Sequence, residues 1–231
     1  MKRFYKQAGV VQAAGGHGVS LDARLVKTPG KHDLIVPSLA LASAMAVEWE
    51  AQQGEIRRET MPLTRLAGLT IDRSAIERDA VVRQVAHYAG TDLVCYRATH
   101  PPALAARQQA VWQPLIDWAS ERYAAPLMVT TGVIPTSQPA ASLAAFAAVV
   151  DGHDDFALTA LHAATAACGS LVIALALFEG CLDAGEAFAA SHLDESFQIE
   201  SWGEDGEQAK RRAALAADIA AAALFTVLLR G

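Results

Sequence analysis

The sequence has few cysteines, and none of them has the spacing of a disulfide framework or a redox motif. Its three cysteines, Cys95, Cys168 and Cys181, are far apart along the 231 residues, and no CxxC pair occurs. Secreted disulfide-stabilised domains carry an even number of closely spaced cysteines. We therefore expect three reduced thiols in a reducing compartment.

Signatures of common enzyme active sites are also absent. No serine lies in a GxSxG motif, and the seven histidines show neither HxxxH nor HExxH spacing. The glycine-rich residues 15–18 match neither GxGxxG nor the phosphate-loop spacing, and no helical pattern follows them. They are typical of a hairpin turn in which glycine supplies a positive φ. The absence of these signatures weakens the case for an enzyme.

A metal site has one weak candidate, the consecutive residues His153, Asp154 and Asp155. Three neighbouring residues before a helix do not easily converge on one ion, and aspartate is a favoured helix cap. We predict that Asp154 or Asp155 caps a helix and that no metal is bound.

The chain lacks an excess of positive charge. It carries 19 basic and 25 acidic residues, which gives a net charge of -6. Nucleic-acid binders have a basic face, and membrane-surface proteins have clusters of lysine and arginine. With 52% hydrophobic and 19% charged residues the chain is globular, and we expect neither a nucleic-acid partner nor an anionic membrane surface as partner.

One long run, residues 156–178, contains no formally charged residue and is long enough to span a bilayer. Many of its positions are Ala, Thr, Gly or Ser, His162 lies within it, and no Lys/Arg flank orients it. A second apolar run, residues 213–229, is interrupted by Asp218. We predict a buried central helix over 156–178 and no membrane span.

The fold class follows from a change of pattern along the chain. Residues 1–37 consist of short apolar pieces separated by turn residues, which indicates strands. Ser38 then has the position of an N-cap, and Leu41, Met45 and Trp49 share one face of the following helix. Trp49 is expected in the core, with Glu48 and Glu50 in solvent. The rest is helical in pattern.

The sequence therefore predicts an α+β protein, with a small β-rich N-terminal subdomain followed by a larger all-helical C-terminal subdomain. The boundary is placed at the extended residues 59–64, which gives an N-terminal α/β subdomain over 1–60 and a helical subdomain over 61–231.

Within the helical part, one apolar face is expected to use Leu104, Val111, Leu115 and Trp118, and Pro114 to kink or split that helix near Gln113. The connection before it contains Asp92 and Arg97. Two interpretations of this connection remain open, a buried ion pair between the two residues and a simple turn.

Residues 193–205 contain five of the eleven acidic residues of the C-terminal third. Asp194 and Glu195 are expected in the last turns of a helix, where the macrodipole favours cations instead. This misfit suggests a contact with a partner outside the chain. An ordinary solvated helix end is the alternative.

Six motifs occur in an order that resembles one protein family. They are Lys2-Arg3-Phe4-Tyr5; Leu21-Asp22-Ala23-Arg24 with Lys27-Thr28-Pro29; Glu48-Trp49-Glu50-Ala51-Gln52; Met61-Pro62-Leu63-Thr64; Asp92 with Cys95-Tyr96-Arg97; and Gln198 with Trp202-Gly203. Together they resemble the assembly chaperones of the ATP synthase F1 sector, which bind the free alpha subunit in mitochondria and in some bacteria. The resemblance covers nearly the whole chain.

The resemblance implies a monomeric chaperone, not an enzyme and without a cofactor, that keeps the unassembled alpha subunit soluble until the beta subunit replaces it. It implies partner-binding roles for Asp194, Glu195, Gln198 and Trp202. The remaining motif residues with an implied structural role are Trp49, Pro62, Tyr96, Arg97 and Gly203. This chain differs from the usual run of glutamates in having Asp194 first and Ser196 third.

The compartment implied is the bacterial cytoplasm, or the mitochondrial matrix for a mature form whose presequence is left off. A rival interpretation is a small cytoplasmic hydrolase or transferase that uses histidines and acids. It predicts that Asp92, Arg97, His87 and His153 converge on one pocket.

Overall fold

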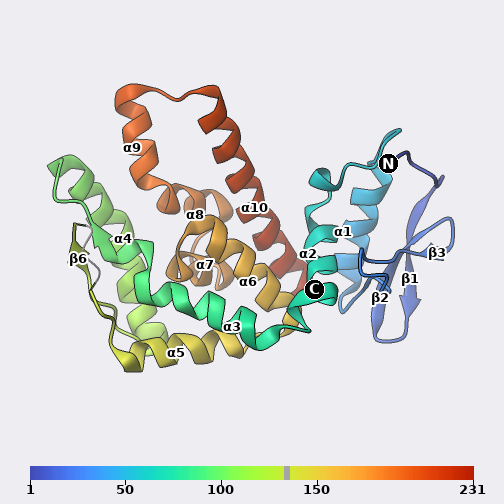
Figure 1. Cartoon of the computed structure of the whole chain (residues 1–231), viewed down its shortest axis with the longest axis horizontal. Coiled ribbons are helices and arrows are strands. Elements are labelled where there is room, and N and C mark those ends of the chain that lie inside the picture. The colour runs from blue at the N-terminus through green and yellow to red at the C-terminus, as the bar shows by residue number, and fades with distance from the viewer. Residues whose placement is uncertain (133–135) are drawn as a thin grey trace. The chain divides into compact units, whose positions relative to one another are not determined.

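The computed structural model describes residues 1–132 and 136–231. The chain forms two compact units (Figure 1). The first contains Met1–Arg78, Asp154–Ala160 and Leu224–Gly231, and the second contains Asp79–His153 and Leu161–Ala223. The first unit thus continues past residue 60 and gains two segments from later in the chain.

The first unit is built on a small antiparallel sheet. Its strands are β1 (Ala8–Ala13), β2 (Gly16–Leu21), β3 (Arg24–Leu25) and β4 (Ile35–Val36). The strand β2 pairs with each of the other three. Ala13 pairs with Gly16, so β1 and β2 form a tight hairpin, and Gly15 at its tip has a φ of 89°. The hairpin predicted from the glycines is confirmed.

Helix α1 (Leu39–Glu50) covers this sheet, and α2 (Pro62–Leu69) packs against α1 (Figure 1). The Ser38 hydroxyl accepts a hydrogen bond from the Leu41 backbone N–H at 3.0 Å, which confirms the predicted N-cap. The predicted apolar face of Leu41, Met45 and Trp49 is buried.

Glu48 and Glu50 are not simply solvated, as the sequence suggested. The half-buried Glu48 carboxylate accepts hydrogen bonds from the backbone N–H groups of Leu63 and Thr64, at 2.7 and 2.8 Å. These N–H groups belong to the first turn of α2, which has no acceptor within the helix for them. Glu50 accepts from the Ala8 N–H at 2.7 Å. Both acids therefore connect α1 to neighbouring backbone.

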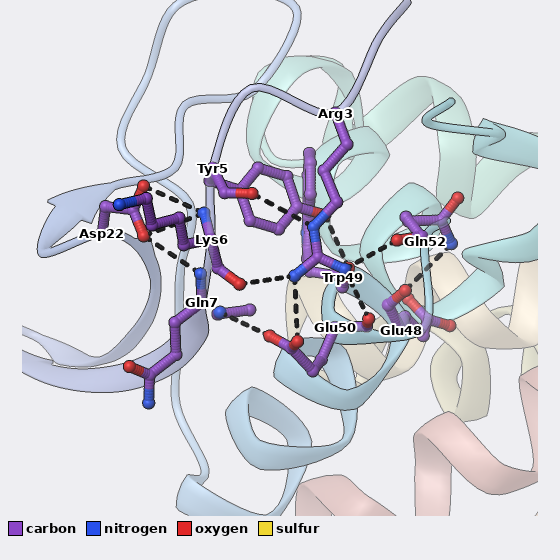
Figure 2. Close-up of polar contacts among 10 residues, drawn as sticks. Arg3, Tyr5, Lys6, Gln7, Asp22, Glu48, Trp49, Glu50 and Gln52 are labelled. Carbon is purple, nitrogen blue, oxygen red and sulfur yellow. Dashed lines mark hydrogen bonds and ion pairs between the residues drawn. The ribbon is translucent and has the colours of Figure 1, made fainter. Parts of the chain in front are cut away.

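Figure 2 shows how the N-terminal residues are held against the end of α1. The Arg3 guanidinium donates to the carbonyls of Glu50 and Gln52, at 2.9 and 2.7 Å, and to the Glu50 carboxylate at 2.9 Å. The Tyr5 hydroxyl donates to the Trp49 carbonyl at 2.5 Å. The first motif of the sequence thus binds carbonyls at the C-terminus of α1 and just beyond it.

Replacing Glu48 with alanine is expected to lower the free energy of unfolding by about 1–2 kcal/mol, because two N–H groups of α2 lose their acceptor. Burial raises the pKa of Glu48, and the N–H groups of Thr64 and Leu63 oppose that rise. Urea unfolding followed by circular dichroism measures the change. The exposed Glu55→Ala is the matched control, and an equal effect of the two substitutions would contradict the capping role.

The second unit is mainly helical. Its elements, some of which extend into the first unit, are α3 (Arg78–His87), α4 (Pro102–Tyr123), α5 (Ala140–Asp151), α6 (Asp155–Cys168), α7 (Leu171–Phe178), α8 (Ala184–Ser191), α9 (Leu193–Trp202), α10 (Gly206–Arg230), and the short parallel strands β5 (Tyr96–Arg97) and β6 (Thr130–Thr131). A small N-terminal sheet followed by helices confirms the predicted α+β class.

The expected single helix over residues 156–178 is wrong, because two helices occupy this run. Helix α6 ends at Cys168, Gly169 adopts a φ of 65°, and the Ser170 hydroxyl caps α7 through the Ile173 N–H at 3.0 Å. All eight side chains of α7 are buried, and α7 contacts α4 and α8. The centre of the second unit is therefore a helix of only eight residues (Figure 1).

Asp92 is fully buried and lies at the N-terminus of α7. Its carboxylate accepts hydrogen bonds from the Ser170 hydroxyl at 2.6 Å and from the N–H groups of Leu171 and Val172 at 2.8 and 3.1 Å. It also accepts from the Val94 N–H at 3.2 Å. The acid therefore caps α7, and the ion pair with Arg97 that the sequence left open does not form.

Helix α4 is not split at Pro114, contrary to one of the expectations. It runs unbroken from Pro102 to Tyr123. Pro114 and Ala110, whose carbonyl loses its hydrogen bond to the missing N–H, are both exposed, so water can satisfy that carbonyl. The expected core position of Val111 is also wrong, since this residue is 37% exposed, whereas Leu104, Leu115 and the neighbouring Trp112 are buried.

Helix α10 is long and apolar enough to cross a bilayer by length and composition alone. Core helices of soluble proteins satisfy the same test, so this is weak evidence for a span. Several of its side chains, including Ile219 and Phe225, are buried within the chain.

Candidate functional site

The acidic stretch singled out in the sequence forms α9 and the turn after it. Asp194 and Glu195 lie in the first turn of α9 and not in the last turns of a helix, so that expectation is wrong. The chain leaves helical geometry at His192, with φ -112° and ψ 26°, and a new helix starts. The macrodipole favours acids in a first turn. The misfit inferred from the sequence therefore disappears in the structure.

Asp194 contacts a glutamine of α4. Its carboxylate accepts a hydrogen bond from the Gln108 side-chain amide at 2.7 Å. Gln108 is buried, its amide oxygen accepts from the Ala98 N–H at 2.7 Å, and its backbone carbonyl accepts from the Arg97 guanidinium at 3.0 Å. The structure therefore connects Asp194 and Arg97, two residues far apart in the sequence, through Gln108.

Glu195 connects α9 to α10, which runs beside it (Figure 1). Its carboxylate accepts from the side chains of Gln208 at 3.0 Å and Arg212 at 3.1 Å. Arg211 donates to the same carboxylate. Burial alone would raise the pKa of Glu195, but the hydrogen bonds from Gln208, Arg212 and Arg211 lower it. Glu195, only 16% of whose side chain is exposed, is thus engaged within the chain.

The opposite flank of α9 is attached to α4. The Arg107 guanidinium donates to both oxygens of Glu200, at 2.6 and 3.0 Å, and lies 5.2 Å from the centre of the Phe197 ring. Bidentate pairing fixes orientation as well as distance. With Glu195 on one flank and Glu200 on the other, the position of α9 on the second unit is well determined.

The free face of α9 presents Gln198 and Trp202. These residues are one helical turn apart, so their side chains are neighbours, and both are exposed. Trp202 is 81% exposed, which is unusual for so large an apolar side chain. Gly203 ends the helix with a φ of 80°, a conformation that favours glycine. Of the four predicted partner-binding residues, these two are accessible, and the two acids are largely occupied.

An apolar groove lies beside α9, between α4 and α8. Its volume is about 400 Å³. Most of its lining is apolar and consists of Val111, Leu115, Leu182, Ala189, Ala190 and Leu193. The polar lining residues are Arg107, Glu186 and Ser196. The sequence pattern does not reveal this groove, because Val111 and Leu115 fit the helical period of a core face equally well.

The remaining motif residues lie elsewhere. Trp49 is buried in α1, and Pro62 is the first residue of α2, a position where its missing N–H costs nothing. Tyr96 and Arg97 form β5, and the buried Arg97 guanidinium lies 5.3 Å from the Trp112 ring.

Two of the four residues that the rival interpretation requires to converge do not share a site. Asp92 and Arg97 are both buried and bind different partners. Burial raises the pKa of the Cys95 thiol to about 12, so it is not a ready nucleophile. The Asp154 carboxylate caps α6 through the N–H groups of Phe156 and Ala157, as predicted. Among residues 1–132 and 136–231, no group of three or more His, Cys, Asp or Glu side chains is placed to hold a metal ion.

Comparison with known proteins gives consistent results. The family model described as ATP12 chaperone protein matches residues 2–120. The protein named atp12, mitochondrial, of Schizosaccharomyces pombe is 23% identical over 214 residues, which cover 87% of this chain and 74% of that protein.

Solved structures extend the match to nearly the whole chain. Atp12 from Paracoccus denitrificans is 43% identical with a TM-score of 0.94, and the match covers 99% of this chain and 98% of that one. The Atu1473 protein of Agrobacterium tumefaciens is 40% identical with a TM-score of 0.95, covering 99% and 86%. Because the family model spans more than half of the chain and these relatives span nearly all of it, the chain belongs to the ATP12 family of ATP synthase assembly chaperones.

Proposed function

We propose that this protein binds the unassembled alpha subunit of the F1 sector, shields its subunit interface from aggregation and releases it to the beta subunit. A subunit destined for an obligate interface exposes a large apolar patch, and such patches aggregate. A folded protein that covers the patch prevents this, and a tighter native partner displaces it by mass action. Membership of the family supports the proposal.

The single observation that carries this proposal is the exposed Trp202 on a helix whose two flanks are fixed. Tryptophan is enriched among the residues that dominate binding energy at protein interfaces. A rigidly held helix also loses little conformational entropy when it is bound. The apolar groove beside α9 offers a place for an apolar side chain of the client.

The four partner-binding residues then have two different tasks in the proposal. Gln198 and Trp202 contact the client directly. Asp194 and Glu195 hold α9 on α4 and α10, and their remaining lone pairs are available to basic or amide groups of the client. The protein acts by binding and not by catalysis, without a cofactor or nucleic acid, and as a monomer. The site of action is the compartment where F1 assembles, the bacterial cytoplasm or the mitochondrial matrix.

The test is to mix the intact chain with unassembled alpha subunit and to follow size-exclusion co-elution and light scattering. A stoichiometric complex and suppressed aggregation are expected, and adding beta subunit should dissociate the complex. If the two proteins elute separately and the alpha subunit aggregates at its usual rate, the proposal is wrong.

Replacing Trp202 with alanine is expected to weaken binding to the alpha subunit at least tenfold, the effect of losing about 1.4 kcal/mol of binding energy. The side chain is exposed, so the melting temperature and the circular dichroism spectrum should not change. Ile76→Ala, which removes an exposed apolar side chain of the first unit, is the matched control. Equal affinity of the two variants would show that Trp202 is not a contact.

A further inference from the structure

Two of the three acids of α9 are balanced by arginines, and the third is not. Glu195 and Glu200 each form an ion pair with arginine of a neighbouring helix. Asp194 forms no ion pair within the described residues, and its hydrogen-bond partner there is the neutral side-chain amide of Gln108. The negative charge of Asp194 is therefore not matched by a cation of this chain.

The orientation of the Gln108 amide follows from its second contact. One end of the amide lies 2.7 Å from the backbone nitrogen of Ala98, and because a backbone N–H only donates, this end is the amide oxygen. The amide nitrogen therefore faces Asp194, also at 2.7 Å. Gln108 is only 1% exposed, and its backbone carbonyl accepts from the Arg97 guanidinium at 3.0 Å. Both the backbone and the side chain of Gln108 are thus held in place.

The contact with Gln108 occupies one oxygen of the Asp194 carboxylate and leaves the other free. Oδ1 accepts from the amide, and Oδ2 has no hydrogen-bond partner in the part of the chain that the structure describes. Asp194 is partly exposed, and Oδ2 is not one of the side-chain atoms that are both buried and unsatisfied, so solvent reaches it. Gln108 therefore fixes a carboxylate that still has an accessible acceptor atom.

This acceptor continues the row of residues proposed to contact the client. Asp194, Gln198 and Trp202 follow one another at intervals of one helical turn, so their side chains lie along the same side of α9. Gln198 and Trp202 are exposed. A partner that covers this row also meets Asp194. A carboxylate without a cation of its own chain is complementary to a lysine or arginine side chain of the partner.

We propose that Gln108 is a positioning residue for client recognition. It holds Asp194 so that Oδ2 accepts a hydrogen bond from a lysine or arginine side chain of the client. Gln108 acts through Asp194 and does not touch the client, because it is buried. The inference rests on the proposed function and deepens it by naming the chemical group that this end of α9 recognises.

The test exchanges the amide and the acid between the two positions. In Asp194→Asn the Gln108 nitrogen still donates to position 194, so the new amide turns its oxygen inward and its nitrogen outward. Adding Gln108→Glu reverses this orientation, because an ionised carboxylate only accepts and draws the nitrogen of the new amide inward. The control adds Gln109→Glu, an exposed neighbour on α4, to Asp194→Asn. Both double variants keep the wild-type net charge.

The first measurement needs no client. The chain contains no asparagine, so ¹⁵N-asparagine labelling of the variants isolates the side-chain amide at position 194. We expect its protons to exchange with solvent at least about fivefold more slowly with Gln108→Glu than with Gln109→Glu, because one of them is then bonded to the introduced carboxylate. Asp194→Asn alone should exchange as fast as the control double variant.

The second measurement is the affinity of each variant for unassembled alpha subunit, by isothermal titration calorimetry. Asp194→Asn should weaken binding at least about tenfold, because a nitrogen that cannot accept then faces the cation of the client. Gln108→Glu should restore at least about threefold of this loss relative to Gln109→Glu, because an amide oxygen again faces outward. A role of Gln108 in stability alone predicts no such rescue.

The two measurements separate this inference from the proposed function. Equal exchange in the two double variants would overturn the positioning role of Gln108, whatever the client does. Different exchange with equal affinity would show that the client does not contact Oδ2, and the inference would fall while wild-type binding upholds the proposed function. If the wild-type chain does not bind the alpha subunit, the proposed function fails, and the exchange rates alone decide whether Gln108 orients position 194.

The orientation can also be tested without the substitution of a buried residue. Asp194→Asn is a conservative change at a partly exposed position, so this variant is expected to fold. Fast exchange of its side-chain amide protons supports an outward nitrogen and thus the inference. Slow exchange would place the nitrogen against Gln108 and overturn it, even if the variant with Gln108→Glu does not fold.

Discussion

Replacement of Asp92 with alanine should lower the free energy of unfolding by about 3 kcal/mol. The substitution removes the acceptor of the Ser170 hydroxyl and of the Leu171 and Val172 N–H groups in a region without access to water. Hydrogen bonds to charged groups contribute about 1.5–3 kcal/mol each, and a buried donor left without an acceptor adds a desolvation cost. The cost of burying the carboxylate in the wild-type protein offsets part of this loss. Urea unfolding monitored by circular dichroism gives the value.

Two further variants show whether the effect belongs to the cap. Ser170→Ala removes one donor to Asp92 and the hydroxyl cap of Ile173, so a loss of about 1 kcal/mol is expected. Asp117→Ala, an exposed aspartate of α4, should change stability by less than about 0.5 kcal/mol. An Asp92→Ala protein as stable as Asp117→Ala would refute the role of Asp92.

The same carboxyl predicts a pH dependence. Burial raises the pKa of Asp92 to about 6, in spite of the hydrogen bonds from Ser170, Val172, Val94 and Leu171 that oppose the rise. The folded state therefore binds this proton more tightly than the unfolded state, whose aspartate pKa is about 3.9. The contribution is fully present below pH 4 and is lost as the pH rises through 6. Relative to Asp92→Asn, which does not titrate, the wild-type protein should lose roughly 2–3 kcal/mol between pH 4 and 7.

Charge reversal at Glu195 is expected to have the second largest effect, a loss of about 2–3 kcal/mol in the free energy of unfolding. Glu195→Lys removes an acceptor of Gln208, Arg211 and Arg212 and places a cation beside the two arginines, although Arg212 keeps its pair with Glu204. Breaking a buried pair costs about 3–5 kcal/mol, and the partial exposure of Arg211 reduces the figure here. Thermal and urea unfolding measure the loss.

Glu207→Lys is the matched control for this reversal. Glu207 lies in the first turn of α10, and its carboxylate is almost fully exposed in a pair with Lys210, so its reversal should change stability far less. Glu195→Gln should fall between the two, because an amide oxygen still accepts from one arginine. If Glu195→Lys and Glu207→Lys have the same melting temperature, the connection between α9 and α10 does not contribute to stability.

A variant can lose binding either because a contact is removed or because α9 is no longer held in place. A Glu195→Lys protein that fails to bind the alpha subunit has changed both the charge and the support of α9. Trp202→Ala changes only an exposed side chain. If Trp202→Ala loses binding while its melting temperature is unchanged, the loss is direct evidence for a contact surface. The acidic residues are best tested by Asp194→Asn, because this change keeps the size of the side chain that meets Gln108.

Elements whose signals are local could be predicted from the sequence. The hairpin at residues 15–18, the Ser38 cap and the apolar face of α1 each depend on residues within a few positions of one another. The α+β class follows from the succession of such local patterns along the chain. Glycine and serine at residues 169 and 170 also carried the signal of a helix break, but the uncharged run around them concealed it.

The candidate site depended on contacts that no local pattern contains. The sequence alone gave Asp194 and Glu195 as acids at the end of a helix, and only the folded chain brings Gln108 from α4 and Arg211 and Arg212 from α10 to them. The apolar groove beside α9 likewise forms only where α4 and α8 meet. Local sequence determines which segments become helix, strand or turn, because propensity and capping act over a few residues. Which polar groups are satisfied and which remain available is decided by tertiary packing, since their partners lie tens of residues away.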